Sequence, residues 1–136
     1  MKTLFVCRGN VGRSQIAEAL FRKRFPEAEV SSAGIKISGP EQPIGELVPQ
    51  IQEVLDVMNK EGIDVSGAVR KQLTEQMVKD ADKVIVIIED GEILPEYLSH
   101  SSKLIRWNVA DPKGMNLELT RKVKDQIKSL IDSIRQ

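Results

Sequence analysis

The sequence predicts an α/β domain in which a parallel sheet is covered by helices on both faces. Segments typical of short strands alternate with segments of helical spacing, and this order favours parallel strands joined through helices. The segment Lys83–Ile88 is apolar almost throughout, as a central strand buried on both faces should be. The 136 residues suffice for one hydrophobic core and contain no linker, so we expect one domain over residues 1–136.

The first third of the chain predicts two strands with a helix between them. Residues 2–6 ("KTLFV") form a short apolar run, and Glu29–Gly34 is a second strand-like run. Between them, Ser14–Phe25 has the spacing of a helix that Pro26 ends. The apolar residues of this helix share one face: Ile16, Ala17, Leu20 and Phe21. Two glycines and two prolines then indicate a loop at 36–45.

The rest of the chain predicts three helices and two strands. A helix that ends before Gly62 is indicated by Leu47, Val48, Ile51, Val54, Leu55 and Met58. Thr74 is suited to cap a short helix that precedes the strand Lys83–Ile88. A fourth strand is predicted at Lys103–Asn108. The last helix begins at about Asn116, and its predicted inward face contains Leu119, Val123, Ile127, Leu130 and Ile134.

Composition and charge argue against several classes of function. Twenty basic and twenty acidic residues cancel, so the global charge favours neither nucleic acid nor an anionic membrane as a partner. No apolar run is long enough to span a bilayer, and Arg8 interrupts the first run too early for a signal peptide. The single cysteine cannot form an internal disulfide. We therefore expect a cytoplasmic monomer that binds neither nucleic acid nor membrane.

The single cysteine, Cys7, stands where the first predicted strand ends, in the stretch "FVCRGNVGRS". In open α/β sheets, ligands bind beyond the carboxyl ends of the strands. Such a strand-to-helix loop can turn backbone N–H groups inward and form a nest for a tetrahedral anion, to which the helix N-terminus adds. We therefore predict that phosphate is bound by residues 8–14: Arg8, Gly9, Asn10, Val11, Gly12, Arg13 and Ser14.

Individual residues of this loop suit an oxyanion and a reactive sulfur. Gly9 and Gly12 relax the limits on backbone dihedral angles, and Asn10 tolerates a left-handed backbone. Arg13 offers a planar fork to two phosphate oxygens. Ser14 can donate its hydroxyl to the sulfur and also cap the helix. Because the same field stabilises a thiolate, we expect the pKa of the cysteine to lie well below its usual value of about 8.5.

Taken singly, these residues have plainer interpretations. A lone cysteine after an apolar run is most often a small buried hydrophobe, Arg13 is compatible with an ordinary surface position, and glycines occur in common strand-to-helix turns. A nucleotide-binding loop matches less well, because the Walker lysine is missing and the G-x-G-x-x-G fingerprint is incomplete. The combination of residues favours the anion-binding loop.

The pattern C-x-x-N-x-x-R-S, here Cys7, Asn10, Arg13 and Ser14, resembles the low-molecular-weight protein tyrosine phosphatase superfamily, which also contains thiol-dependent arsenate reductases. The resemblance covers essentially the whole chain, through "RSQIAEALF", "SSAG", "KQLTEQMVKDADKVIVI" and "ADP". It implies a four-stranded parallel sheet flanked by helices. It also implies catalysis through a phosphocysteine, with no metal or other cofactor.

A candidate general acid follows the fourth predicted strand. A phosphate ester is cleaved slowly unless the departing oxygen is protonated, so a thiolate nucleophile needs an acid nearby. The stretch "VADPKG" puts Asp111 at the same carboxyl edge as Cys7, although an isolated Asp-Pro is usually only a turn. Its match to the acid loop of the family implies that Asp111 protonates the leaving group and then activates water, while Pro112 holds the loop.

The chain departs from the family pattern at three places. Tyrosine-specific members usually carry aromatic residues after the Asp-Pro, whereas Lys113 and Gly114 follow it here. A histidine often precedes the stretch Gln72–Thr74, but here none does, and the only histidine, His100, is expected to be solvated. Arg8 stands where a small or apolar residue is commoner. Arg8 is either a solvated cation with no role, or a cation that gives the enzyme a preference for substrates with a second negative charge near the phosphate.

The sequence therefore favours a phosphomonoesterase, expected to be a protein tyrosine phosphatase, that uses Cys7, Arg13 and Asp111 on a phosphorylated protein or a small phosphate ester. The alternative is an arsenate reductase, because arsenate and phosphate are nearly isosteric. Reductases that relay electrons internally need further cysteines, so only a type that uses an external low-molecular-weight thiol fits this chain. A catalytically silent anion-binding module is the weakest alternative, since nucleophile, arginine and acid are all present.

Overall fold

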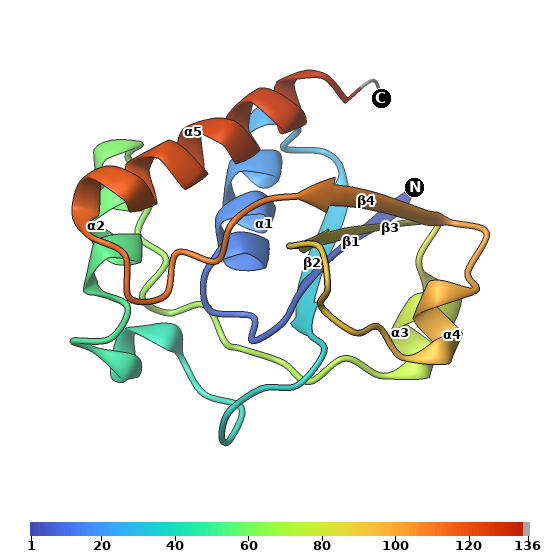
Figure 1. Cartoon of the computed structure of the whole chain (residues 1–136). Helices are drawn as coiled ribbons and strands as arrows, with labels where there is room; N and C mark the ends of the chain where they lie inside the picture. The colour runs from blue at the N-terminus through green and yellow to red at the C-terminus, as the bar shows by residue number, and fades with distance from the viewer. Residues whose placement is uncertain (135–136) are drawn as a thin grey trace.

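The computed structural model describes residues 1–134, and at its centre is a four-stranded sheet in which all neighbouring strands are parallel (Figure 1). The strand order is β2-β1-β3-β4, so β1 and β3 lie in the middle. The strands span Lys2–Cys7 (β1), Glu29–Gly34 (β2), Lys83–Ile88 (β3) and Leu104–Asn108 (β4). The predicted fold class, a single α/β domain with a four-stranded parallel sheet, is confirmed.

Helices cover both faces of the sheet (Figure 1). One face carries α1, α2 and α5, and the other carries α3 and α4. The helical segments are α1 (Arg13–Arg24), the 3-10 turn η1 (Ile44–Leu47), α2 (Gln52–Lys60), α3 (Glu75–Asp80), α4 (Glu96–Ser99) and α5 (Leu117–Asp132). The short helix α4 was not predicted, because four residues are too few to show a helical period.

The central strands are buried on both sides. In β3, Ile85 and Ile87 belong to the core beneath α1, α2 and α5, whereas Val84 and Val86 belong to the core beneath α3 and α4. Successive side chains of a strand point to opposite faces, so a strand covered twice has no polar side to show. This explains why "KVIVII" is apolar without alternation.

All four strands end at one edge of the sheet. Cys7 pairs with Gly34 at the ends of β1 and β2, and Ile88 pairs with Asn108 at the ends of β3 and β4. The loops that leave these strand ends are therefore neighbours, although they are far apart in the sequence. Ligand sites of open α/β sheets lie at this edge.

The second predicted helix begins later than expected. Leu47 belongs to η1, Val48 has an extended backbone with φ −68° and ψ 147°, and α2 begins at Gln52. Because Pro49 disfavours a helical backbone at the residue before it, a helix cannot continue through Val48. The prediction that Leu47 and Val48 belong to this helix is wrong.

The last helix begins as predicted, and of the residues predicted to face inward only Leu119 points away from the core. The side chain of Asn116 caps α5 by accepting a hydrogen bond from the N–H of Leu119 at 2.9 Å. Leu119 itself is 43% exposed, so the prediction that it faces the core is wrong. Val123 and Ile127 are buried as predicted, and Leu130 and Ile134 pack against the core. Thr120 and Ile131 are also buried, and Leu119 is rotated from Thr120 by about 100° around the helix axis.

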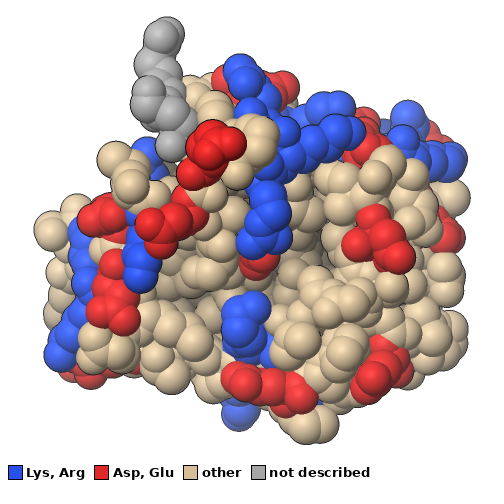
Figure 2. All heavy atoms as spheres, turned by 180° about the vertical axis from the view of Figure 1, so that it is seen from behind, with Lys and Arg blue, Asp and Glu red and all other residues tan. Residues whose placement is uncertain are grey.

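Charges of both signs lie next to one another on the face of the molecule shown in Figure 2. This agrees with the equal numbers of basic and acidic residues in the sequence. Local groups of charges, and not the net charge, therefore decide which ligands are attracted.

None of the helices within residues 1–134 is long and apolar enough to cross a membrane.

Candidate active site

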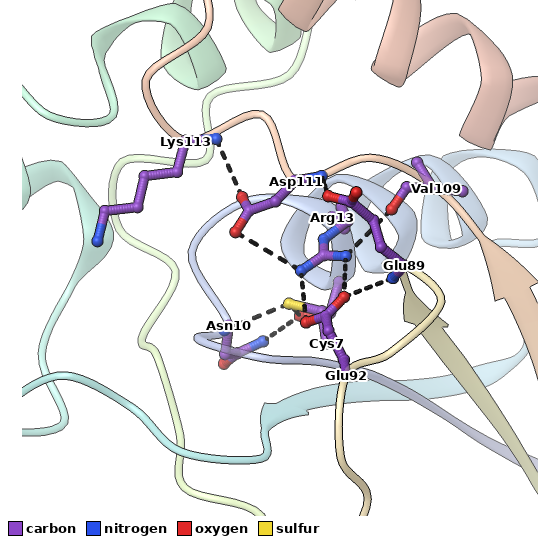
Figure 3. Close-up of polar contacts among 9 residues, drawn as sticks. Cys7, Asn10, Arg13, Glu89, Glu92, Val109, Asp111 and Lys113 are labelled. Carbon is purple, nitrogen blue, oxygen red and sulfur yellow. Dashed lines mark hydrogen bonds and ion pairs between the residues drawn. The ribbon is translucent and has the colours of Figure 1, made fainter.

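The loop from β1 to α1 surrounds the sulfur of Cys7 (Figure 3). Cys7 is the last residue of β1, and it is buried. Its Sγ accepts a hydrogen bond from the backbone N–H of Asn10 at 3.3 Å and lies 2.9 Å from the hydroxyl oxygen of Ser14. The structure thus brings these three residues of the predicted motif together around one sulfur atom.

The side chain of Asn10 uses all four of its hydrogen-bonding positions. Its Oδ1 accepts from the backbone N–H of Lys71 at 2.8 Å and from Nε2 of Gln15 at 3.2 Å. Its Nδ2 donates to the hydroxyls of Ser14 at 2.8 Å and Ser32 at 2.9 Å. The backbone of Asn10 has φ 57°, the left-handed conformation expected for it. These contacts fix the loop and the orientation of the amide together.

The contacts of Asn10 also determine which way the hydroxyl of Ser14 points. Because the oxygen of Ser14 accepts from Asn10, its proton is available for donation to Sγ of Cys7. The expectation that Ser14 also caps the helix is wrong. The N-cap residue of α1 is Gly12, and no side chain caps this helix. The hydroxyl of Ser14 is instead used inside the loop.

Two glycines let other segments approach the loop closely. A Cβ at Gly34 would lie 2.9 Å from the carbonyl oxygen of Arg8, and a Cβ at Gly12 would lie 3.0 Å from Cγ of Pro112. The loop is therefore enclosed between the end of β2 and the Asp-Pro segment. Neither Gly9 nor Gly12 has a positive φ. Gly12, with φ −118° and ψ −95°, has neither a helical nor an extended backbone, and it provides space for Pro112.

Arg13 is the first residue of α1, and its side chain is only 2% exposed. Its Nη1 donates to Oε2 of Glu92 and to the carbonyl oxygen of Val109, both at 3.1 Å. Its Nη2 donates to Oε1 of Glu92 at 3.4 Å and lies 3.7 Å from Oδ2 of Asp111. Among the described residues Nε has no hydrogen-bond partner. The edge of the guanidinium formed by Nε and Nη2 is therefore the one open to an oxyanion.

Arg13 and Glu92 hold each other in their charged forms. Burial acts to lower the pKa of Arg13, but the hydrogen bond to Glu92 and the charges of Cys7, Glu92 and Asp111 outweigh it and raise the pKa. Burial acts to raise the pKa of Glu92, but the hydrogen bonds from Arg13 and from the backbone N–H of Glu89 lower it. The pair therefore stays ionised, and the arginine is held in one orientation.

Asp111 follows β4, and its side chain is 41% exposed. Its Oδ1 accepts a hydrogen bond from the backbone N–H of Lys113 at 3.0 Å, and its own backbone N–H donates to Oε1 of Glu89 at 2.8 Å (Figure 3). The predicted residues Cys7 and Arg13, at the two ends of the loop from β1 to α1, and Asp111, in the loop after β4, thus lie at one edge of the sheet.

An open groove of about 750 Å³ adjoins the loop. Arg8 is exposed and lines this groove, whereas Gly9 and Val11 are partly buried in the loop. The groove contains both signs of charge and two apolar side chains. Its lining residues are Arg8, Ile35, Lys36, Glu89, Asp90, Gly91, Glu92, Ile93 and Asp111.

Several residues of the site were not predicted. Glu89 and Glu92 lie just after the end of β3. The rule that ligands bind beyond the carboxyl ends of the strands, which indicated Asp111, would therefore also have indicated them. Ser32 and the backbone N–H of Lys71 carried no such signal, because they are recognised only by their contacts with Asn10. These contacts hold the loop in place through Asn10. Within residues 1–134, no group of three or more His, Cys, Asp or Glu side chains is arranged to hold a metal ion.

The family model described as low molecular weight phosphotyrosine protein phosphatase matches residues 2–136, which is nearly the whole chain. The chain belongs to this family. The resemblance that the motif around Cys7 indicated is therefore confirmed.

Relatives of this family member have different activities. Arsenate reductase 2 of Staphylococcus epidermidis is 28% identical over 132 residues, which are 96% of this chain and 93% of the reductase. The low molecular weight protein tyrosine phosphatase from T. tengcongensis is 32% identical, with a TM-score of 0.78 over 97% of this chain and 95% of that chain. A mutant of the YwlE arginine phosphatase, with a phosphorylated active-site serine, is 25% identical, with a TM-score of 0.77 over 96% of this chain and 91% of that chain. The family thus includes both phosphatases and arsenate reductases.

Proposed function

We propose that this chain is a cysteine-dependent phosphomonoesterase that forms a phosphocysteine intermediate on Cys7. The observation that carries the proposal is the surroundings of Sγ, which accepts hydrogen bonds from Asn10 and Ser14 beside the buried cation of Arg13. Donors of this kind stabilise a thiolate when it attacks and again when it leaves. A structural cysteine in a core would have no use for them.

The reaction has two steps. In the first, the thiolate of Cys7 attacks phosphorus, the S–P bond forms, and the bond from phosphorus to the ester oxygen breaks. Protonated Asp111 gives its proton to the departing oxygen, so a neutral alcohol or phenol leaves. In the second step, the carboxylate of Asp111 takes a proton from water as the water attacks phosphorus. The S–P bond then breaks, and inorganic phosphate leaves the regenerated enzyme.

Arg13 and the loop bind the phosphoryl oxygens. Glu92 and Val109 hold Nη1 and one N–H of Nη2, which leaves the edge with Nε to form two parallel hydrogen bonds to the phosphoryl group. The backbone N–H groups of residues 8–14 and the N-terminus of α1 complete the cradle. Arg8 lines the adjoining groove and there favours substrates with a second negative charge.

The substrate class that we propose is a phosphorylated protein, with phosphotyrosine as the first candidate. The family description and the phosphatase from T. tengcongensis support phosphotyrosine. The arginine phosphatase with a phosphorylated active-site serine supports a phosphoenzyme in this fold. Lys113 and Gly114, which follow the Asp-Pro where tyrosine-specific members usually carry aromatic residues, leave the substrate ring without a wall from this loop.

The second candidate function is arsenate reduction, and the similarity to the Staphylococcus epidermidis reductase favours it. Cys7 would displace an oxygen of arsenate as water and form an S–As bond. An external small thiol would then attack Sγ, so that arsenite leaves with the electron pair of the S–As bond and a mixed disulfide forms. A second external thiol would restore Cys7. Two thiols thereby supply the two electrons, because the chain has no second cysteine.

The two functions are separated by measuring p-nitrophenyl phosphate hydrolysis, and arsenate reduction with a low-molecular-weight thiol, on the same preparation. The proposal predicts ester turnover of about 1 s⁻¹ or more, as for ordinary enzymes, and arsenate reduction near the background rate. A phosphotyrosine peptide should then be cleaved faster than the matched phosphoserine peptide. Rapid arsenate reduction together with slow ester hydrolysis would contradict the proposal and support the reductase.

A further inference from the structure

The segment Glu89–Glu92, which follows β3, contacts the side chain of Arg13, which is proposed to bind the phosphoryl group, and the backbone of Asp111, the proposed acid (Figure 3). Glu92 holds Arg13 through both of its carboxylate oxygens. Glu89 accepts a hydrogen bond from the backbone N–H of Asp111, with 2.8 Å between Oε1 and N. One short segment is therefore connected both to α1 and to the loop after β4.

The carboxylate of Asp111 is itself only loosely held. Its Oδ1 accepts from the N–H of Lys113 within the same turn, and Oδ2 lies 3.7 Å from Arg13, which is beyond hydrogen-bond distance. The next residue, Pro112, has no N–H to donate. The position of the carboxylate therefore depends on the backbone of residue 111, and Glu89 is the partner of that backbone N–H.

Glu89 is held in turn by its neighbours. Its backbone N–H donates to Oε2 of Glu92, and the same oxygen accepts from Nη1 of Arg13. The contacts thus form a continuous path from Arg13 through Glu92 and Glu89 to the backbone of Asp111. Displacement of any member of this path would change the distance between the proposed acid and the phosphate-binding arginine.

We propose that Glu89 is a positioning residue, which sets the place of the acid loop, and so of the Asp111 carboxylate, relative to Arg13 and Cys7. The inference rests on the proposed function, in which Asp111 protonates the leaving group. Glu89 acts through the backbone of Asp111. Its loss should therefore impair proton transfer and leave phosphate binding unchanged.

The test compares three variants of the full chain. Glu89→Ala removes the acceptor, and Glu89→Gln keeps an oxygen that can accept from the N–H of Asp111. Glu27→Ala is the matched control, because Glu27 is also an exposed glutamate but precedes the amino end of β2, away from the groove and from the carboxyl edge of the sheet. Glu89 is exposed, so its removal takes nothing from the core.

Each variant is assayed with an alkyl phosphate, whose leaving group needs protonation, and with p-nitrophenyl phosphate, whose leaving group needs it much less. Glu89→Ala should lower kcat for the alkyl ester by about tenfold to a hundredfold, since a catalytic group misplaced by roughly 1 Å costs about that much. It should change kcat for the aryl ester and the inhibition constant of inorganic phosphate less than about twofold. Glu89→Gln and Glu27→Ala should resemble the wild type.

A second measurement does not depend on catalytic turnover. In the NMR spectrum, the amide proton of Asp111 should move upfield in Glu89→Ala, because it loses a hydrogen bond to a carboxylate, and it should not move in Glu27→Ala. An unmoved resonance in Glu89→Ala would overturn the inference, as would equal slowing of both esters or no slowing of the alkyl ester.

An Asp111→Asn variant keeps the two proposals distinguishable. If it slows the alkyl ester selectively while Glu89→Ala does not, the positioning role is wrong and the proposed function stands. If it shows no selectivity for the leaving group, Asp111 is not the acid, and both the positioning role and the acid step of the proposed mechanism are wrong, whereas the role of Cys7 is tested separately by Cys7→Ser.

Discussion

Asn10 is the residue that connects the loop around Cys7 to the rest of the fold. Its amide contacts α1 through Gln15, β2 through Ser32 and the segment before α3 through Lys71. The same amide donates to Ser14 and thereby directs the hydroxyl of Ser14 toward the sulfur. An asparagine is required for this, because two donors and an acceptor must lie on one short side chain.

Asn10→Asp should impair catalysis while the chain stays folded. The new carboxylate can still accept from Lys71 and Gln15, but it cannot donate to Ser14, whose proton then turns away from the sulfur. A hydrogen bond to a charged group contributes about 1.5–3 kcal/mol, so kcat for p-nitrophenyl phosphate should fall at least about tenfold. Asn59→Asp, the same change at an exposed position of α2, is the control. Equal kcat values for both variants would refute the role given to Ser14.

At the scale of elements, Glu61 joins the end of α2 to α5. Its carboxylate is 2.8 Å from Nζ of Lys124 and 2.9 Å from Nζ of Lys128, and its side chain is 15% exposed. The hydrogen bonds from Lys124 and then Lys128 lower the pKa of Glu61 to about 2. Because α5 packs on α1, this pair of contacts helps to hold the helix layer that carries Arg13.

The lowered pKa of Glu61 predicts how stability depends on pH. A carboxyl whose pKa is depressed by folding stabilises the fold above its unfolded pKa of about 4.3, and this contribution is lost as pH falls toward 2. Glu61→Gln should therefore lower the free energy of unfolding by about 1–2 kcal/mol at pH 7. This is less than the full pKa shift would give, because Lys128 is half exposed and solvent screens its charge. In urea unfolding, the difference from wild type should shrink between about pH 5 and pH 3. A difference that is constant with pH, or equal to that of Glu27→Gln at an exposed site, would contradict this account.

Elements whose pattern reflects burial could be predicted from the sequence. The strand Lys83–Ile88 has the predicted bounds, because burial on both faces leaves only apolar residues in it. The start of α2 was missed because the apolar spacing of Leu47 and Val48 matched a helix, while the constraint from Pro49 prevailed locally. The orientation of Leu119 was missed because α5 carries more apolar residues than the core accepts.

At the scale of the whole molecule, the topology brings distant residues into one site. Glu92 and Val109 contact Arg13 across 79 and 96 positions of the chain. The rule that ligands bind at the carboxyl edge indicated where Cys7 and Asp111 would lie, because it requires only the strand ends. No such rule shows which carboxylate meets which donor. The contacts of Glu89, Glu92 and Ser32 therefore became visible only in three dimensions.

The central claim, that Cys7 is the nucleophile, is tested most directly by the steady-state turnover of p-nitrophenyl phosphate by a Cys7→Ser variant that still binds phosphate. The hydroxyl is a far weaker nucleophile than a thiolate, whereas Arg13 and the loop N–H groups remain to bind the oxyanion. We predict no measurable turnover, with phosphate binding by calorimetry close to that of the wild type. Hydrolysis at a rate comparable to the wild type would contradict the account.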